Sequence, residues 1–263
     1  MSEREEYPPG VPCWVETLQP GPHEALDFYG PLFGWEFSDP GPMPGGGEYF
    51  VARIRGRDAA AVGALAPVGG PAVPSWNTYV SVDDIEAATA RATVAGGTVL
   101  IGPLDALPAG RLAVVIDPGG AAICLWEAAE RTGAQVVNEP GTWTMSSLHT
   151  TDVHLANEFY GAVFGWEPEA YGPVTLFRLP GYMGGLEGQP IPRDVVAVMA
   201  PPSAEIPPHW NVNFRVADAD ATAEQAAALG GMVMAAPMDT PGFRSAVLGD
   251  RQGAVFSVSS LAP

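Results

Sequence analysis

The chain has 263 residues, 47% of them hydrophobic, and its formal net charge is −18. This length can bury two cores without disulfides, and no apolar run is long enough to span a membrane. The negative charge argues against a nucleic acid partner, because phosphate backbones would be repelled. The amino terminus lacks the apolar core of a secretory signal, and Cys13 and Cys124 have no metal-type spacing, so we expect a cytoplasmic protein.

A repeated segment organises the chain. FYGPLFGW at residues 28–35 returns as FYGAVFGW at residues 159–166, which is 131 positions later. Further matches follow, since Trp76-Asn77 corresponds to Trp210-Asn211. A period of this length is too long for a solenoid unit and suits two tandem domains. We therefore predict one domain over residues 1–127, a linker over residues 128–141 and a second domain over residues 142–263.

Each predicted domain consists of two modules in which a strand, a helix and three further strands follow one another. The helix of the first module opens at Pro22 and ends at Gly34, and the strands of this module are expected at 11–18, 35–38, 48–55 and 59–66. In the second module an Ala-rich helix ends before Gly96, between strands at 76–82, 98–102, 112–117 and 121–126. The four modules cover about residues 10–66, 75–127, 142–200 and 208–260. The sequence thus predicts an α+β chain of four βαβββ modules.

The turns between these elements resemble those of a known family. They are the FYxx(L/V)FGW helix end, the Trp-Asn strand start, the Gly-Gly turn and the Asp-Pro-Gly-Gly of residues 117–120. Over about residues 10–260 the chain resembles the vicinal oxygen chelate superfamily, which includes glyoxalase I, bleomycin resistance proteins and extradiol dioxygenases. It is most similar to two-domain actinobacterial members of the mycobacterial 27 kDa antigen type. The resemblance implies tandem glyoxalase-like domains with two cup-shaped mixed sheets, whereas such turn residues specify function weakly.

Enzymes of that superfamily hold a divalent metal with His, Glu or Gln on inward strand positions. The resemblance places these positions at Trp14, Asn77 and Cys124 in the first domain and at Met145, Asn211 and Ser257 in the second. Neither set offers the carboxylate and imidazole donors that such ions need. We therefore expect no metal and no other cofactor, and a metal-dependent glyoxalase-type lyase is the least favoured activity.

Strand alternation assigns the side chains that face each cup. The first cup is expected to be aromatic, with one carboxylate, and its residues are Trp14, Glu16, Leu18, Asn77, Tyr79, Ser81, Ala122, Cys124 and Trp126. The second is expected to be polar, and its residues are Met145, Ser147, His149, Asn211, Asn213, Arg215, Ser257 and Ser259. We predict substrate contacts from Trp14, Asn77, Tyr79, Cys124, Trp126, Met145, Asn211 and Arg215.

Glu16 and His149 are the predicted catalytic residues. A carboxyl group among aromatic rings has its ionised form disfavoured, which raises its pKa and suits proton transfer near neutrality. The alternative is that Glu16 only fixes the cup through hydrogen bonds, and that His149 is a structural strand residue. If the modules paired in an exchanged arrangement, Glu16 would instead face Asn211 and Arg215.

Two charged pairs recur in both domains, Asp105 with Arg111 and Asp239 with Arg244. They either bind a ligand at the mouth of each cup or form structural ion pairs that tie a loop. The second interpretation is favoured, because most such ion pairs are structural.

The function that we favour is a metal-independent lyase of the dehydratase or cyclase type, which acts on a hydrophobic aromatic, polyketide-like molecule with Glu16 as acid and base. The alternative is a binding or self-resistance protein that sequesters an aromatic metabolite unchanged. Both take a small aromatic molecule as the partner, without nucleic acid or membrane, and both suit a monomer or a homodimer. A third possibility, which rests on the fold family alone, is an interaction protein whose cups are vestigial.

Overall fold

The computed structural model describes residues 3–43, 46–65, 73–185 and 189–262. In the first half of the chain the strands are Pro12–Gln19 (β1), Glu36–Phe37 (β2), Gly41–Pro42 (β3), Glu48–Ile54 (β4), Arg57–Ala64 (β5), Ser75–Ser81 (β6), Thr98–Ala106 (β7), Gly110–Ile116 (β8) and Ala122–Ala128 (β9). The helices of this half are Pro22–Phe33 (α1) and Ile85–Val94 (α2).

In the second half the strands are Trp143–His149 (β10), Glu167–Tyr171 (β11), Val174–Arg178 (β12), Val195–Met199 (β13), His209–Arg215 (β14), Met232–Thr240 (β15), Phe243–Gly249 (β16) and Val255–Leu261 (β17). The helices are Val153–Phe164 (α3) and Ala219–Ala228 (α4). None of these helices, within the described residues, is long and apolar enough to cross a membrane.

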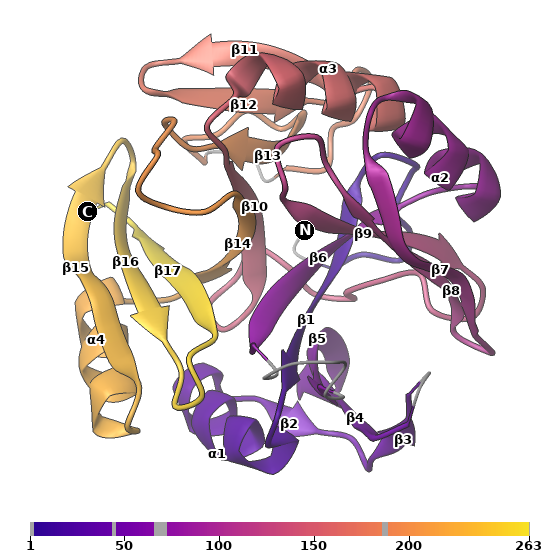
Figure 1. Ribbon diagram of the computed structural model, residues 1–263. Helices are drawn as coiled ribbons and strands as arrows, with labels where there is room; N and C mark the ends of the chain where they lie inside the picture. Colours follow the sequence, from indigo (N-terminus) through magenta and orange to yellow (C-terminus); the bar gives the residue numbers. More distant parts are fainter. Residues whose placement is uncertain (1–2, 44–45, 66–72, 186–188, 263) are drawn as a thin grey trace.

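The strands form two curved mixed sheets with matching strand orders (Figure 1). The first sheet runs β2-β4-β5-β1-β6-β9-β8-β7, with β3 paired to β4, and the second runs β11-β12-β13-β10-β14-β17-β16-β15. The repeat in the sequence is therefore a repeat in the structure. The predicted α+β architecture of four βαβββ modules in two sheets is confirmed. We call the inward faces of the two sheets the first cup and the second cup.

Neighbouring modules pair within each sheet. Strand β1 runs parallel to β5 and antiparallel to β6, and β10 pairs in the same way with β13 and β14. Glu16 consequently lies between Ala61 and Asn77. The exchanged arrangement, in which Glu16 would face Asn211 and Arg215, is not the one that forms.

The repeated segment builds the ends of α1 and α3. Gly34 and Gly165 close these helices in the left-handed region, with φ of 71° and 74°, which glycine adopts without a steric cost. The aromatic residues before each glycine are buried, and Tyr29 and Tyr160 are fully so. The motif therefore specifies a helix end and its packing.

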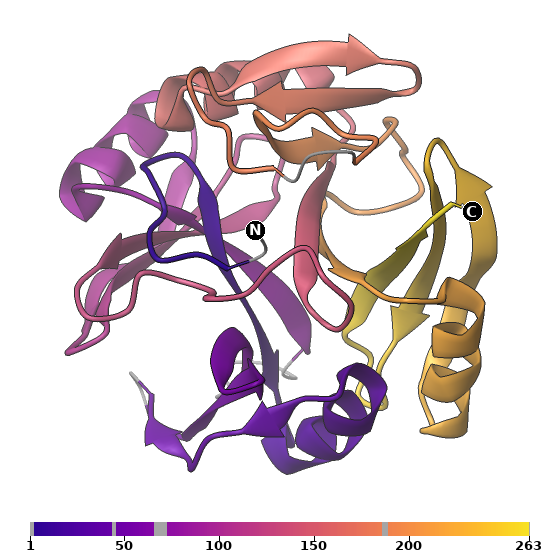
Figure 2. The same ribbon diagram turned by 180° about the vertical axis from the view of Figure 1, so that it is seen from behind.

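The two halves pack against each other through their helices. Figures 1 and 2 show α1 beside α4 and α2 beside α3. One core joins α1 to Phe214 and Phe256 of the second sheet, and the other joins α3 to Val80 of the first sheet. Since strand side chains alternate between faces, the opposite face of each sheet is left to line its cup.

The segments that precede β1 and β10 cross to the other half of the molecule. The indole of Trp166 donates to the carbonyl oxygen of Gly10 at 2.7 Å, and that of Trp35 donates to Gly141 at the same distance. The two segments also touch each other through a bridge between Glu3 and Val136. The amino-terminal residues are thereby placed against the second half of the chain.

Candidate functional site

The first cup is built around Glu16 of β1. This residue is 6% exposed, and its two side-chain oxygens accept hydrogen bonds from Tyr79 Oη at 2.5 Å and Tyr49 Oη at 2.7 Å. The indole of Trp14 donates to Tyr49 Oη at 3.0 Å. Burial raises the pKa of Glu16, and the two tyrosine hydroxyls offset part of that rise because they stabilise the ionised form.

The other predicted residues of the first cup lie around this carboxyl group. Tyr79 lies opposite Trp14 and beside Cys124, and the ring of Trp126 stands edge-on to Tyr79 with centroids 6.3 Å apart. Asn77 lies opposite Glu16 on β6. Among the residues that sequence alternation assigned to this cup, Trp14, Glu16, Asn77, Tyr79, Cys124 and Trp126 thus lie on the neighbouring strands β1, β6 and β9.

Tyr49 and Arg131 were missed by the sequence analysis. The guanidinium of Arg131 lies 5.6 Å from the ring centroid of Trp14, and its carbonyl oxygen accepts a hydrogen bond from the Trp126 indole at 2.8 Å. Tyr49 follows the alternation of side chains along β4, so the sequence pattern could have predicted that it faces the cup. Arg131 lies in the linker between the halves, where no periodicity indicates direction.

The second cup contains a cavity of about 340 Å³. Strands of the second sheet form its wall, and the amino-terminal segment, with Arg4 and Tyr7, and residues 189–192 also border it. Among the residues predicted for this cup, the ones at the cavity are Met145, Ser147, Asn213, Arg215 and Ser259. The amino-terminal residues were missed, because their position depends on the crossing of that segment to the other half.

Arg215 is the most buried charged group at the cavity. It closes β14, its residue is 4% exposed, and its guanidinium carbon lies 5.2 Å from the ring centroid of Phe243. Nearby, Ser259 Oγ donates to Asn213 Oδ1 at 3.1 Å. Burial lowers the pKa of Arg215, although a guanidinium keeps its proton in proteins.

His149 and Asn211 do not border this cavity. The imidazole of His149 stacks on that of His209, with centroids 4.5 Å apart and planes 8° from parallel. Burial and the neighbouring imidazole lower the pKa of His149 to about 4. Asn211 Nδ2 donates to Ser257 Oγ at 2.7 Å, which ties β14 to β17. Both side chains thus have structural partners outside the cavity.

The positions that hold a metal in the superfamily do not fit a divalent ion here. In the first cup the Trp14 indole nitrogen is a donor already bonded to Tyr49, and burial raises the pKa of the Cys124 thiol, so a thiolate is disfavoured. In the second cup the amide of Asn211 is bonded to Ser257, and Met145 adds a thioether. Neither set supplies a carboxylate or an imidazole, so we derive no metal chemistry from them.

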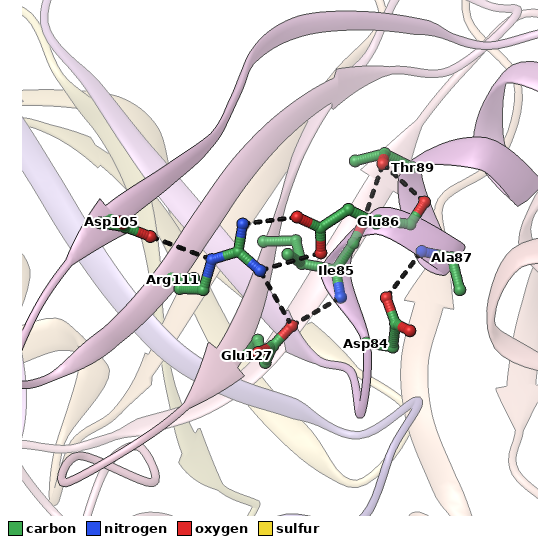
Figure 3. A network of polar contacts seen from close by, with 8 residues as sticks. All are labelled: Asp84, Ile85, Glu86, Ala87, Thr89, Asp105, Arg111 and Glu127. Atoms are coloured by element: carbon green, nitrogen blue, oxygen red, sulfur yellow. Dashed lines mark hydrogen bonds and ion pairs between the residues drawn. The ribbon is translucent and has the colours of Figure 1, made fainter.

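A three-carboxylate group with metal-like spacing lies outside both cups and consists of Asp84, Glu86 and Glu127. Figure 3 shows how protein groups occupy it. Arg111 binds both oxygens of Glu86, at 2.6 and 2.8 Å, and Glu127 Oε2 accepts the backbone N–H of Ile85 at 2.7 Å. These carboxylates cap and anchor the start of α2.

The recurring aspartate–arginine pairs belong to this kind of anchor. Arg111 Nε bonds Asp105 Oδ1 at 3.0 Å while its terminal nitrogens bind Glu86 (Figure 3). In the second half Arg244 bonds Asp239 at 3.0 Å and Asp220 Oδ1 at 2.7 Å. Each arginine therefore ties an edge hairpin to the adjacent helix, in agreement with the structural interpretation. The helix carboxylates, Glu86 and Asp220, were missed by the sequence analysis.

Comparison with protein-family models gives two matches. Residues 19–125 match the Glyoxalase/Bleomycin resistance protein/Dioxygenase superfamily, and residues 144–259 match a glyoxalase-like domain. Together the two segments cover most of the chain, one in each half.

Relatives of full length are also found. The chain is 41% identical over 268 residues to the "Putative glyoxylase CFP32" of Mycobacterium bovis, covering 100% of this chain and 99% of the relative. It is 35% identical over 270 residues to the anthracycline biosynthesis protein DnrV of Streptomyces peucetius, covering 97% and 94%.

Solved structures share the fold at low sequence identity. The Mn(II)-bound glyoxalase of Novosphingobium aromaticivorans superposes with a TM-score of 0.63 at 15% identity, over 96% of this chain and 82% of that one. The 2,3-dioxygenase LapB of Pseudomonas sp. KL28 gives a TM-score of 0.63 at 12% identity, over 98% and 94%. At such identity the likeness concerns the fold alone.

Proposed function

Because the chain belongs to the glyoxalase/bleomycin resistance protein/dioxygenase superfamily, we propose that it binds a planar aromatic metabolite in its second cup without a metal ion. The observation that carries this proposal is the cavity of about 340 Å³ in that cup. Its volume falls within the range of about 300–1,000 Å³ that is usual for small-molecule sites. A binding function requires only such a cavity and a suitable lining.

The lining suits an aromatic ligand. Tyr7, Trp143, Tyr182 and Phe243 supply rings at its border, and strands β12 and β13 supply aliphatic side chains. Aromatic rings favour stacked or edge-to-face contacts with other rings, which adds to the free energy gained from burial. The similarity to a protein named for anthracycline biosynthesis supports an aromatic polyketide as the class of ligand.

Native mass spectrometry of the purified protein, combined with metal analysis, tests this proposal. We expect a co-purified aromatic molecule or stoichiometric binding of the anthraquinone quinizarin, without a stoichiometric transition metal. Val198→Phe, which narrows the cavity from β13, is expected to weaken quinizarin binding at least about tenfold, because the added ring occupies the ligand volume.

The matched control is Val255→Phe, because Val255 lies on the same sheet, is 38% exposed and does not border the cavity. It is expected to bind as the unmodified protein does. Equal affinity of both variants, or a stoichiometric metal held in either cup, would contradict the proposal.

A second candidate function, a metal-independent lyase, is favoured by Glu16. Its pKa is raised, so that both protonation states are accessible closer to neutral pH than for an ordinary carboxyl group. In a dehydration it would take the proton from the carbon next to a carbonyl group and return it to the hydroxyl group on the adjacent carbon. A carbon–carbon double bond forms as that hydroxyl leaves as water.

The enclosure of Glu16 favours binding over catalysis. Both of its oxygens already accept a hydrogen bond, and Glu16 does not border the second-cup cavity. Product analysis by mass spectrometry with β-hydroxy ketone polyketides separates the two functions. Recovery of every compound unchanged supports sequestration. A dehydrated product that forms with the unmodified protein but not with Glu16→Gln establishes the lyase.

A further inference from the structure

The charge at the second-cup cavity is opposite to that of the whole chain. The sequence has 30 acidic and 12 basic residues. Yet the described residues that border the cavity include two arginines, Arg4 and Arg215, and no aspartate or glutamate. A positively charged pocket in a strongly acidic protein indicates selection for a ligand of negative charge, because such a pocket focuses the field on its contents.

Both arginines have unused hydrogen-bonding capacity. The Nε of Arg215 and the Nε of Arg4 are buried without a hydrogen-bond partner in the part of the chain that the structure describes. Arg215 has one long bond, from Nη2 to Gln189 Oε1 at 3.3 Å, and Arg4 donates to the carbonyl oxygen of Gly184. A buried cation without a counter-charge is costly, so an anion in the cavity would relieve that cost.

Several other arginines among the described residues have carboxylate partners. Arg53 pairs with Asp58 at 2.8 Å, Arg111 with Glu86 at 2.6 Å and Arg244 with Asp220. Within the described residues no carboxylate lies within ion-pair distance of Arg215, although only 4% of this residue is exposed. The position that corresponds to Arg215 in the first half is Ser81, whose hydroxyl donates to the carbonyl oxygen of Tyr7 at 2.9 Å. At this position the second cup therefore carries a charge that the first cup lacks.

The geometry at Arg215 specifies how an anion is held. The guanidinium carbon lies over the Phe243 ring, and Nε has no hydrogen-bond partner within the described residues. Nε and the neighbouring terminal nitrogen form one edge of the guanidinium, which matches the two oxygens of a carboxylate. Asn213 Oδ1 accepts a hydrogen bond from Ser259, and its amide nitrogen donates to no group of the described residues, so that nitrogen can donate to a ligand oxygen.

We propose that the ligand of the second cup is an aromatic carboxylate, which Arg215 binds through a bidentate ion pair and Arg4 attracts as a second cation. This inference rests on the proposed binding function and narrows its ligand class. Aromatic rings of the cavity wall contact the apolar part of the ligand. The ion pair between Arg215 and the ligand carboxylate makes the cavity prefer an acid to its neutral analogue.

Calorimetric titration with 2-naphthoate and with its neutral isostere 2-naphthamide tests the proposal. We expect the carboxylate to bind about 10- to 100-fold more tightly, as is typical of a charge-assisted hydrogen-bonded pair. Arg215→Met keeps an unbranched apolar stem and removes the charged guanidinium. It should abolish the preference, measured as the ratio of the two affinities, and Arg4→Met should reduce that ratio partly.

Arg111→Met is the control for net charge, because Arg111 lies on β8 and pairs with Glu86 and Asp105 away from the cavity. It is expected to keep the full preference, and circular dichroism checks that each variant is folded. Equal affinity for the acid and the amide, or a preference that survives in Arg215→Met, overturns the inference and leaves the proposed binding function standing. Failure of both compounds to bind contradicts the inference and the proposed function together.

Discussion

The hydroxyl group of Tyr160, in α3 of the second half, donates a 2.8 Å hydrogen bond to Asp117 Oδ2 in the first half. Asp117 is 4% exposed, and its other oxygen accepts the backbone N–H of Ala121 at 2.8 Å. Tyr29, in α1 of the first half, donates the equivalent hydrogen bond to Asp250 Oδ2 in the second half, also at 2.8 Å. The interface between the halves is therefore built from the residues that carry the sequence repeat.

The two aspartate oxygens differ in the hydrogen bonds that they accept. Asp250 Oδ2 also accepts a hydrogen bond from Gln19 at 2.7 Å, whereas Tyr160 is the partner found for Asp117 Oδ2. Tyr160→Phe is thus expected to leave a buried carboxylate oxygen unpaired and to lower the free energy of unfolding by about 2–3 kcal/mol. Tyr29→Phe is expected to cost about 1 kcal/mol less. Denaturant titration of both variants measures the difference, and an equal or reversed order would contradict it.

The titration of Glu16 gives a pH prediction. Its pKa in the folded state is raised above the ordinary value of 4.5, so the folded protein retains a proton that the unfolded chain releases. The contribution of Glu16 to stability is therefore fully present below pH 4.5 and is lost as the pH rises through the raised pKa. Glu16→Gln should remove this component of the pH dependence. The free energy of unfolding of both proteins is measured as a function of pH. If the two values change in parallel from pH 4.5 through the raised pKa, Glu16 does not titrate in this way.

Arg111 provides a test of the surface anchors. We expect Arg111→Gln to speed hydrogen exchange at the first turn of α2, because Glu86 loses the side chain that ties it to β8. Ligand affinity in the second cup should not change. Hydrogen-exchange mass spectrometry and quinizarin titration check both parts. A large loss of affinity would instead favour the interpretation that these pairs lie at a ligand site.

Two glycines with similar backbone angles should differ in their tolerance of alanine. At Gly141, with φ of 86°, a Cβ would lie 2.5 Å from the carbonyl oxygen of Phe33, whereas at Gly165, with φ of 74°, it would meet no atom within 4 Å. Gly165→Ala is expected to cost about 1–2 kcal/mol, which is the penalty for the left-handed conformation. Gly141→Ala adds a clash in the crossing between the halves and should cost at least 1 kcal/mol more. Thermal unfolding of the two variants compares them, and similar values would mean that the crossing segment shifts freely.

The amino-acid sequence by itself determined the repeat, the four modules and the membership of the family. It also placed Glu16 among Trp14, Tyr79 and Trp126, because strand alternation depends only on the spacing of residues along one chain. These features are local, so that a pattern of neighbours is sufficient to predict them. The turn glycines gave the helix ends for the same reason.

Only the tertiary structure decided which modules pair, which cup holds a cavity and what closes it. Tyr49 reaches Glu16 from a strand two positions away in the sheet, and Arg4 reaches the second cup from the opposite end of the chain. The lack of a carboxylate partner for Arg215 within the described residues likewise depends on every segment packed around it. Contacts between residues distant in sequence are set by how sheets and crossing segments pack in three dimensions, and no periodicity along the chain encodes them.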